Sequence, residues 1–266
     1  AQDMNTEKVK TALNDVFNSA EVKTIGSANQ LKISTKYKVN ENSAEVDQEV
    51  QQKLYEALVP FLPAKTTYSQ FINAENNVGK MYSGKVSPTI ADDIKKSSVW
   101  AILGSLIVVF LYILLRFKKW QFSLGAVAAV FHDVLIVLGI FSIAWKFLPF
   151  SMEIDQAFIA AILTVIGYSL NDTVVVFDRI REYLNEHTSW KFDKVVNSAL
   201  SSTLSRTLNT SLTTLVVLLA MFTFGADSLR GLLFALIVGV LVGTYSSLFI
   251  ATPIMHDTLK RLDKKE

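Results

Sequence analysis

Five long apolar runs constrain the fold of this chain more than any other feature. Each run is close to the ~20 residues that a helix needs to cross a hydrocarbon core of ~30 Å. Backbone polar groups in lipid must be bonded internally, so such runs predict membrane-spanning helices. We therefore expect residues 89–258 to form an α-helical polytopic membrane bundle. The predicted spans cover about 97–116, 122–144, 156–178, 203–224 and 229–255.

The first 88 residues have the pattern of a small α+β domain. Val9, Leu13 and Phe17 share one side of a predicted helix, and Asn42 and Ser43 can cap a second helix. The order α-β-β-α-β predicts a ferredoxin-like domain that lacks its first strand. The predicted helices cover residues 4–18 and 46–58, and the predicted strands cover 21–25, 31–39 and 80–86.

Basic residues gather in alternate connections between the spans. Residues 116–119 and 179–194 and the tail 259–266 are rich in lysine and arginine, whereas the other connections hold only Lys146 and Arg230. The positive-inside rule places the first set and the C-terminus in the cytoplasm, and the domain 1–88 in the periplasm. An external N-terminal domain needs a preceding span, so we expect an upstream helix. Residues 179–202 are predicted to follow the cytoplasmic membrane surface as an amphipathic helix.

Composition excludes several kinds of site. Residues 1–96 hold 12 lysines and 12 acidic residues, so the domain offers no net positive charge to nucleic acid. The chain has no cysteine, which excludes disulfides, thiolate metal ligands and cysteine nucleophiles. We expect no cofactor, no metal and no enzymatic activity.

Asp172 is the most informative polar residue in the apolar runs. A carboxylate at the centre of a bilayer costs roughly 3 kcal/mol on insertion scales. Its short side chain cannot reach the membrane surface, because it lies six residues, or ~9 Å along a helix, before Asp178. We expect Asp172 to face protein or water, to have a partner and to serve the function.

The fourth run offers that partner. Arg206, Asn209 and Thr213 share one helical face, and Arg206 lies at a depth similar to that of Asp172. Our hypothesis is that Asp172 alternates between a protonated state and a state paired with Arg206. The alternative is that Arg206 extends its guanidinium to the membrane surface and has no other role.

His132 and Asp133 lie near the centre of the second run. One interpretation is a relay in which they exchange protons with Asp172. The other is structural, because polar side chains also pin helices together in a membrane.

The last run carries a stripe of small residues that includes a GxxxG motif. Such a stripe lets another helix approach closely and predicts a packing surface. The stripe consists of Gly231, Ala235, Gly239, Gly243 and Ser247.

Four stretches of the membrane part resemble the SecD/SecF protein-export membrane proteins of the RND transporter superfamily, and in particular their SecF part. The stretches are 132–136, 167–182, 205–214 and 234–247. The resemblance implies that the chain supplies five of the six helices of one RND-type half. The first helix and a SecD or SecD-like half, separate or fused, would then lie outside this sequence.

The resemblance also implies a function and partners. Members of the family associate with the SecYEG translocon in the bacterial cytoplasmic (inner) membrane. They use the proton motive force to promote late-stage export of polypeptides, with protons as the coupling ion. Expected partners are therefore the SecD-like half, SecYEG, the exported polypeptide and membrane lipids. By the same resemblance, Asp172 and Arg206 match the family's intramembrane charged pair, and Asn209 and Thr213 match its polar neighbours.

Three other functions remain open on the sequence. An RND-type exporter of small molecules or lipids is compatible with the superfamily fold. A passive translocon scaffold would use the buried charges only for packing. An intramembrane hydrolase built on Asp133 and Asp172 is the weakest alternative, because no protease-like motif surrounds either residue.

Overall fold

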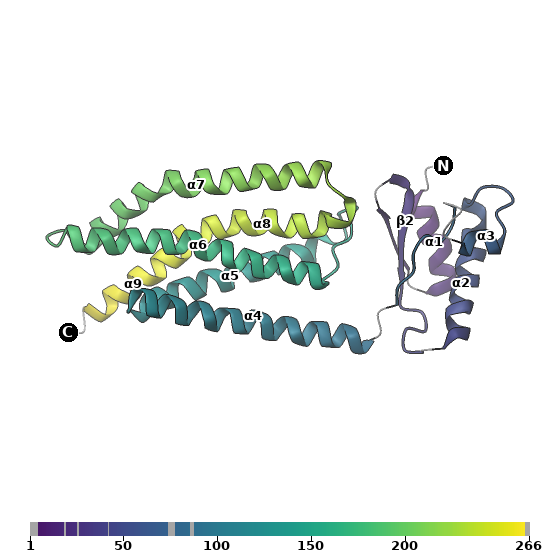
Figure 1. The fold of residues 1–266 in the computed structure, drawn as a ribbon, viewed down its shortest axis with the longest axis horizontal. Helices are drawn as coiled ribbons and strands as arrows, with labels where there is room; N and C mark the ends of the chain where they lie inside the picture. Colours follow the sequence, from purple (N-terminus) through teal and green to yellow (C-terminus); the bar gives the residue numbers. More distant parts are fainter. Residues whose placement is uncertain are drawn as a thin grey trace. The chain divides into compact units, whose positions relative to one another are not determined.

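The computed structural model describes residues 5–18, 20–25, 27–41, 43–73, 78–85 and 88–263. The chain divides into two compact units, Ala1–Lys96 and Ser97–Glu266. The first unit combines short helices with a small sheet, and the second consists of long helices (Figure 1).

The first unit packs helices against one antiparallel strand pair. Strands β1 and β2 pair Ala20 with Thr35 and Val22 with Ile33. Helix α1 begins at a side-chain cap from Asn5, and helix α2 begins at a cap from Ser43. A buried core joins Val9, Leu13 and Phe17 of α1 to β1 and α2. The elements are α1 (Thr6–Phe17), β1 (Ala20–Ile25), β2 (Ser27–Thr35), α2 (Ala44–Leu58), a 3₁₀ turn (Val59–Phe61) and α3 (Tyr68–Ile72).

The structure confirms both helices and the first two strands of the predicted domain but not the third strand. The described part of that stretch, residues 80–85, has no strand, and the amide of Lys80 donates to the carbonyl of Phe71. Gly79 makes this return possible, since it adopts a φ of +100° directly against Phe71. Asn42 and Val86, which belong to the predicted cap and the predicted strand, lie outside the described residues.

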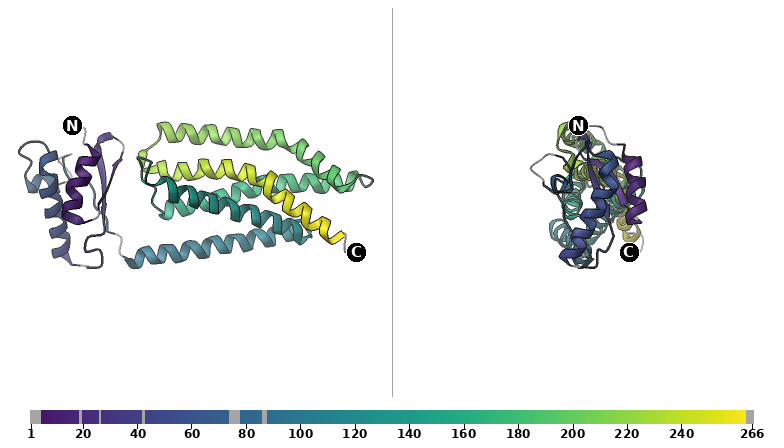
Figure 2. Two further views of the ribbon diagram at one scale, coloured as in Figure 1. Left: turned by 180° about the vertical axis from the view of Figure 1, so that it is seen from behind. Right: turned by 90° about the vertical axis from the view of Figure 1, so that its right-hand side faces the viewer.

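The second unit is a multi-pass membrane bundle, as predicted. Five of its helical segments are long and apolar enough to cross a membrane. Helices α5, α6 and α8 lie between α4 and α7, an arrangement that the view from behind repeats (Figures 1 and 2). The elements are α4 (Pro88–Phe117), α5 (Trp120–Ala144), α6 (Gln156–Glu186), α7 (Phe192–Phe224), a 3₁₀ turn (Asp227–Leu229), α8 (Arg230–Ser246), a π-helical turn (Ser247–Ala251) and α9 (Thr252–Asp263).

The predicted surface helix over residues 179–202 is wrong. Helix α6 continues to Glu186 and α7 already begins at Phe192, so only 187–191 connect them. Apolar residues of this stretch pack inside the bundle instead, since Ile180 and Ala199 are fully buried. Periodicity alone does not separate a helix on a membrane surface from the end of a spanning helix that leaves the bilayer.

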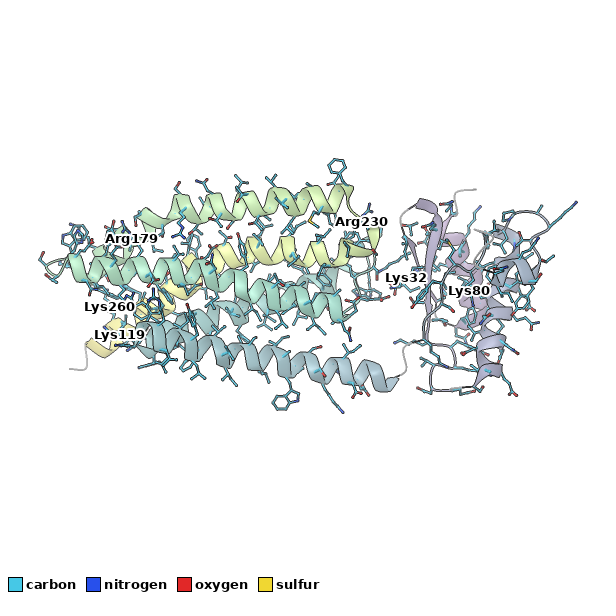
Figure 3. All side chains as sticks on the ribbon, viewed as in Figure 1. Lys32, Lys80, Lys119, Arg179, Arg230 and Lys260 are labelled. Carbon is cyan, nitrogen blue, oxygen red and sulfur yellow. The ribbon has the colours of Figure 1, made fainter. Side chains whose placement is uncertain are left out.

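The two ends of the bundle differ in charge. Lys119, Arg179 and Lys260 lie at one end and Arg230 at the other (Figure 3). The residues that the positive-inside rule assigns to one side of a membrane are thus together in space.

Glu49 gives the first unit a pH-dependent contact. Its carboxylate accepts hydrogen bonds from Tyr37 at 2.8 Å and Lys38 at 2.7 Å and pairs with Lys53 at 3.1 Å. Hydrogen bonds from Lys38, Tyr37 and Lys53 lower the pKa of Glu49 from 4.5 to about 2. The contact is therefore complete at neutral pH.

We predict that Glu49→Gln destabilises the first unit at neutral pH by an amount that shrinks in acid. A depressed pKa stabilises the fold above the unfolded-state pKa, and that stabilisation is lost as the pH falls from 4.5 towards about 2. Hydrogen exchange of peptides from α2 in the whole chain, corrected for the intrinsic rate, measures this. A difference between the two proteins that stays constant across that range would contradict it.

Candidate functional site: two buried carboxylates in the bundle

The site is built where α6 and α8 come into close contact. Gly239 lies directly against the side chain of Val165, and a Cβ on Gly243 would lie 3.0 Å from the Cβ of Ser169. Larger residues would hold the two helices apart. Gly139 on α5 is a useful contrast, because a Cβ there would meet nothing within 4 Å.

Asp133 of α5 lies within this contact and is fully buried. Its Oδ2 accepts hydrogen bonds from Ser169 of α6 at 2.6 Å and from Ser246 of α8 at 2.7 Å. Its Oδ1 lies 3.2 Å from Nδ1 of His132, whose side chain is about one-third exposed. A single carboxylate thus connects three spanning helices.

Asp172 of α6 lies in a second polar contact, with 3 % of its surface exposed. The hydroxyl of Ser211 on α7 lies 3.5 Å from its Oδ2 and only 2.6 Å from the hydroxyl of Thr244 on α8. Thr244 donates its own hydrogen to the carbonyl of Val240, so the single Ser211 hydrogen is drawn towards Thr244. Asp172 is therefore buried with one long, weak hydrogen bond.

Both carboxylates have hydroxyl groups as their nearest partners from other helices. A hydroxyl donates to a carboxylate and can rotate to accept from a carboxylic acid, so it suits either protonation state. A fixed cation would favour the charged state only. Ser169, which binds Asp133, precedes Asp172 by one helical turn on α6, so the two contacts are neighbours along that helix.

The structure does not bring Asp172 and Arg206 into an ion pair. Among the described residues no cation lies within ion-pair distance of Asp172. Arg206, Asn209 and Thr213 all lie on the exposed face of α7, while Ser211, two residues before Thr213, points into the bundle. The alternation between protonated and Arg206-paired states remains a prediction about another conformation.

The small-residue stripe on α8 lies largely inside the bundle. Ala235, Gly239, Gly243 and Ser247 are buried, and Gly231 lies half-buried against the carbonyl of Ser151. The stripe continues into the π-helical turn Ser247–Ala251, a rare geometry that is common at functional sites.

Sequence reasoning missed the hydroxyl partners Ser169, Ser211, Thr244 and Ser246. Serine and threonine are frequent in spanning helices, where they bond to their own backbone, so each carries little signal alone. One signal was present, because Ser169 and Asp172 are three residues apart and therefore share a helical face.

Comparison with known proteins decides the family. The family described as "Protein export membrane protein SecD/SecF, C-terminal" matches residues 66–261. The chain belongs to the SecD/SecF family of protein-export membrane proteins. This match confirms the resemblance that the sequence predicted. Asp133 and Asp172 both lie within the matched region.

Individual SecF and SecDF proteins agree with this assignment. The chain is 52 % identical over 176 residues to the protein translocase subunit SecF of Rhodothermus marinus, covering 66 % of this chain and 57 % of that protein. It is 42 % identical over 170 residues to the protein translocase subunit SecDF of Brucella abortus, covering 64 % of this chain and 22 % of that protein.

A solved structure supports the fold. A crystal structure of SecDF in its super-membrane-facing form superposes with a TM-score of 0.62 at 29 % identity, covering 88 % of this chain and 28 % of that one. This match confirms the predicted fold class. The chain spans about half the length of several SecF relatives.

We predict that replacing both Ser169 and Ser246 with alanine destabilises the bundle more than either single change. A buried carboxylate that loses a donor costs about 1–3 kcal/mol, and the double variant leaves Oδ2 of Asp133 with no hydroxyl donor. Unfolding of the detergent-solubilised protein measures the loss. Ser201→Ala is the control, because Ser201 is exposed and bonds only its own helix.

The same variants combined with Asp133→Asn complete the test. If the serines stabilise the bundle through Asp133, replacing them lowers the free energy of unfolding less in the Asp133→Asn protein than in the unchanged one. An equal cost in both backgrounds would show that the serines act through packing alone.

Proposed function

We propose that the protein containing this chain is an accessory subunit of the Sec protein translocase and couples proton movement to late-stage export of polypeptides. Membership of the SecD/SecF family supports a role in protein export. The relatives named SecF and SecDF support a place in the translocase. The coupling to protons rests on the site.

The observation that carries the proposal is the burial of Asp172, whose carboxylate has one long hydrogen bond, from the hydroxyl of Ser211, among the described residues. Burying a titratable side chain at this depth in a membrane costs free energy. Such side chains therefore occur mainly where protons or ions move. Each elementary charge that crosses a membrane at 100 mV releases ~2.3 kcal/mol. Asp133 would take part as a second proton site, reached through Ser169.

The exposed polar face of α7 supports a helical partner. Arg206, Asn209 and Thr213 would be costly against lipid. A SecD-like half covering this face would shield them and close a proton path between the halves. The relative from Brucella abortus is named SecDF, and this name supports a SecD-like half as the partner. Movement of α7 against α6 would then bring Arg206 to Asp172 in part of the cycle.

Location and the remaining partners follow from the same proposal. The protein would lie in the bacterial cytoplasmic membrane, with the lysine-rich and arginine-rich end of the bundle in the cytoplasm. The unit of residues 5–85 would then be periplasmic and would engage the exported polypeptide beside SecYEG. Membrane lipids would surround the outward face of α4.

A scaffold is the second candidate, and the Asp133 contact favours it. Asp133 has partners on both of its oxygens, so this residue alone fits a purely structural role. Asp172 distinguishes the two functions, because its single long hydrogen bond contributes little to stability.

We predict that Asp172→Asn in the complete protein with its companion half abolishes the proton-dependent stage of export. The amide keeps the size of the side chain but cannot titrate. Export of a secreted substrate into energised vesicles, measured after ATP is exhausted, tests this. Late-stage export should fall to the level seen without a proton gradient.

Asp155→Asn is the matched control on the same helix. Asp155 is exposed and caps α6, and asparagine caps a helix equally well, so export should not change. Wild-type export by an inserted and assembled Asp172→Asn protein would favour the scaffold instead.

A further inference from the structure

Helix α4 is held to the bundle mainly at its C-terminal end. Among the side chains of α4 that the structure describes, those of residues 92–117, the buried ones are Val109, Ile113 and Phe117, all in the last third of the helix. The earlier part reaches the core only through half-buried side chains such as Ile102 and Leu106. Lipid provides no hydrophobic force that would hold the rest of such a helix in place, so its position depends on the contacts at this end.

Helix α5 provides one of those contacts, because Phe122 stacks on Phe117 at 5.0 Å between ring centres. Helix α6 provides the others, from two consecutive residues and a third one turn on. Asp178 lies 3.0 Å from Nη2 of Arg116. Phe177 packs edge-on against Phe117 at 5.8 Å between ring centres. Arg181 donates to the carbonyl of Arg116 at 3.1 Å and lies over the ring of Phe117.

Asp178 is the centre of this contact. One of its oxygens faces Arg116 of α4, and the other lies 3.1 Å from Arg181 of its own helix. The carboxylate therefore lies between two guanidinium groups. It accepts a hydrogen bond from Arg116 and forms an ion pair with Arg181. A partly exposed ion pair adds little to overall stability, so its value lies in the position that it sets.

The same helix carries Asp172, six residues earlier. A rigid helix transmits a shift over this distance, which is ~9 Å along its axis. Helix α4 in turn follows the first unit directly in the chain. A change at Asp172 that moves α6 against α7 would carry α4 with α6.

We infer that Asp178 is a positioning residue that couples the titration of Asp172 to the movement of α4 through the Arg116–Asp178–Arg181 cluster. This inference rests on the proposed function. It assigns the proton step to Asp172 and the transmission of its effect to Asp178. Loss of Asp178 then uncouples the two steps, so protons still move but export does not follow.

The test is Asp178→Asn in the complete protein with its companion half, reconstituted with the translocon. We expect late-stage export to fall several-fold while gradient-driven proton uptake stays at the wild-type rate. Arg116→Gln removes the same pair from the side of α4 and should show the same split. Glu182→Gln is the matched control, because Glu182 lies on the same helix and its carboxylate pairs with Arg179 of α6.

Exchange of the charges gives a rescue test. Arg116→Asp combined with Asp178→Arg again places one carboxylate between two guanidinium groups, since Arg181 is unchanged. Export should recover in this double variant and not in either single one. A purely local stabilising role would not separate proton uptake from export in this way.

Three results would overturn the inference. The first is export at the wild-type rate in Asp178→Asn. The second is equal loss of proton uptake and export, as expected for Asp172→Asn, which would place Asp178 in the proton path itself. The third is an absence of any gradient dependence in the unchanged protein, which would overturn the proposed function as well.

Discussion

The close approach of α6 and α8 is the contact on which the rest of the bundle depends. It exists because Gly239 and Gly243 have no side chain to separate the helices, and it brings Ser169 and Ser246 onto the carboxylate of Asp133. Helix association in lipid relies on such close packing and on polar bonds between helices. In this bundle, one short contact surface supplies both the close packing and the polar bonds between helices.

This packing also explains the division of the bundle into inner and outer helices. Helices α5, α6 and α8 share the buried contact of Asp133, whereas most residues in the apolar stretches of α4 and α7 are not buried. Helix α7 packs a row of buried residues from Val195 to Ser211 on the core, whereas α4 meets the core near Arg116 and Phe117.

Much of this arrangement could be predicted from the sequence. The spans, the two strands and the burial of Asp172 and Asp133 follow from apolar runs, alternation and the cost of charge in lipid. The partners of these carboxylates did not follow, because the choice among many hydroxyl groups depends on how helices rotate against one another. The contact between Asp178 and Arg116 was missed for the same reason, since both residues lie at the ends of predicted spans and the sequence does not tell which ends meet.

The predicted strand at 80–86 and the predicted surface helix over 179–202 failed for different physical reasons. In the first, Gly79 turns the chain back onto Phe71, and no pattern of apolar residues encodes that contact. In the second, the apolar positions were identified correctly, but α6 and α7 extend beyond the apolar runs and bury Ile180 and Ala199 within the bundle.

The protonation of Asp172 is the property that the proposed mechanism requires most. Infrared difference spectroscopy of the complete protein between acidic and alkaline pH detects it, because a carboxylic acid and a carboxylate absorb at different frequencies. We expect a carboxylic-acid band that disappears in Asp172→Asn and persists in Asp155→Asn. An unchanged difference spectrum in Asp172→Asn would show that this carboxyl group does not titrate, and a proton-coupled role for it would be contradicted.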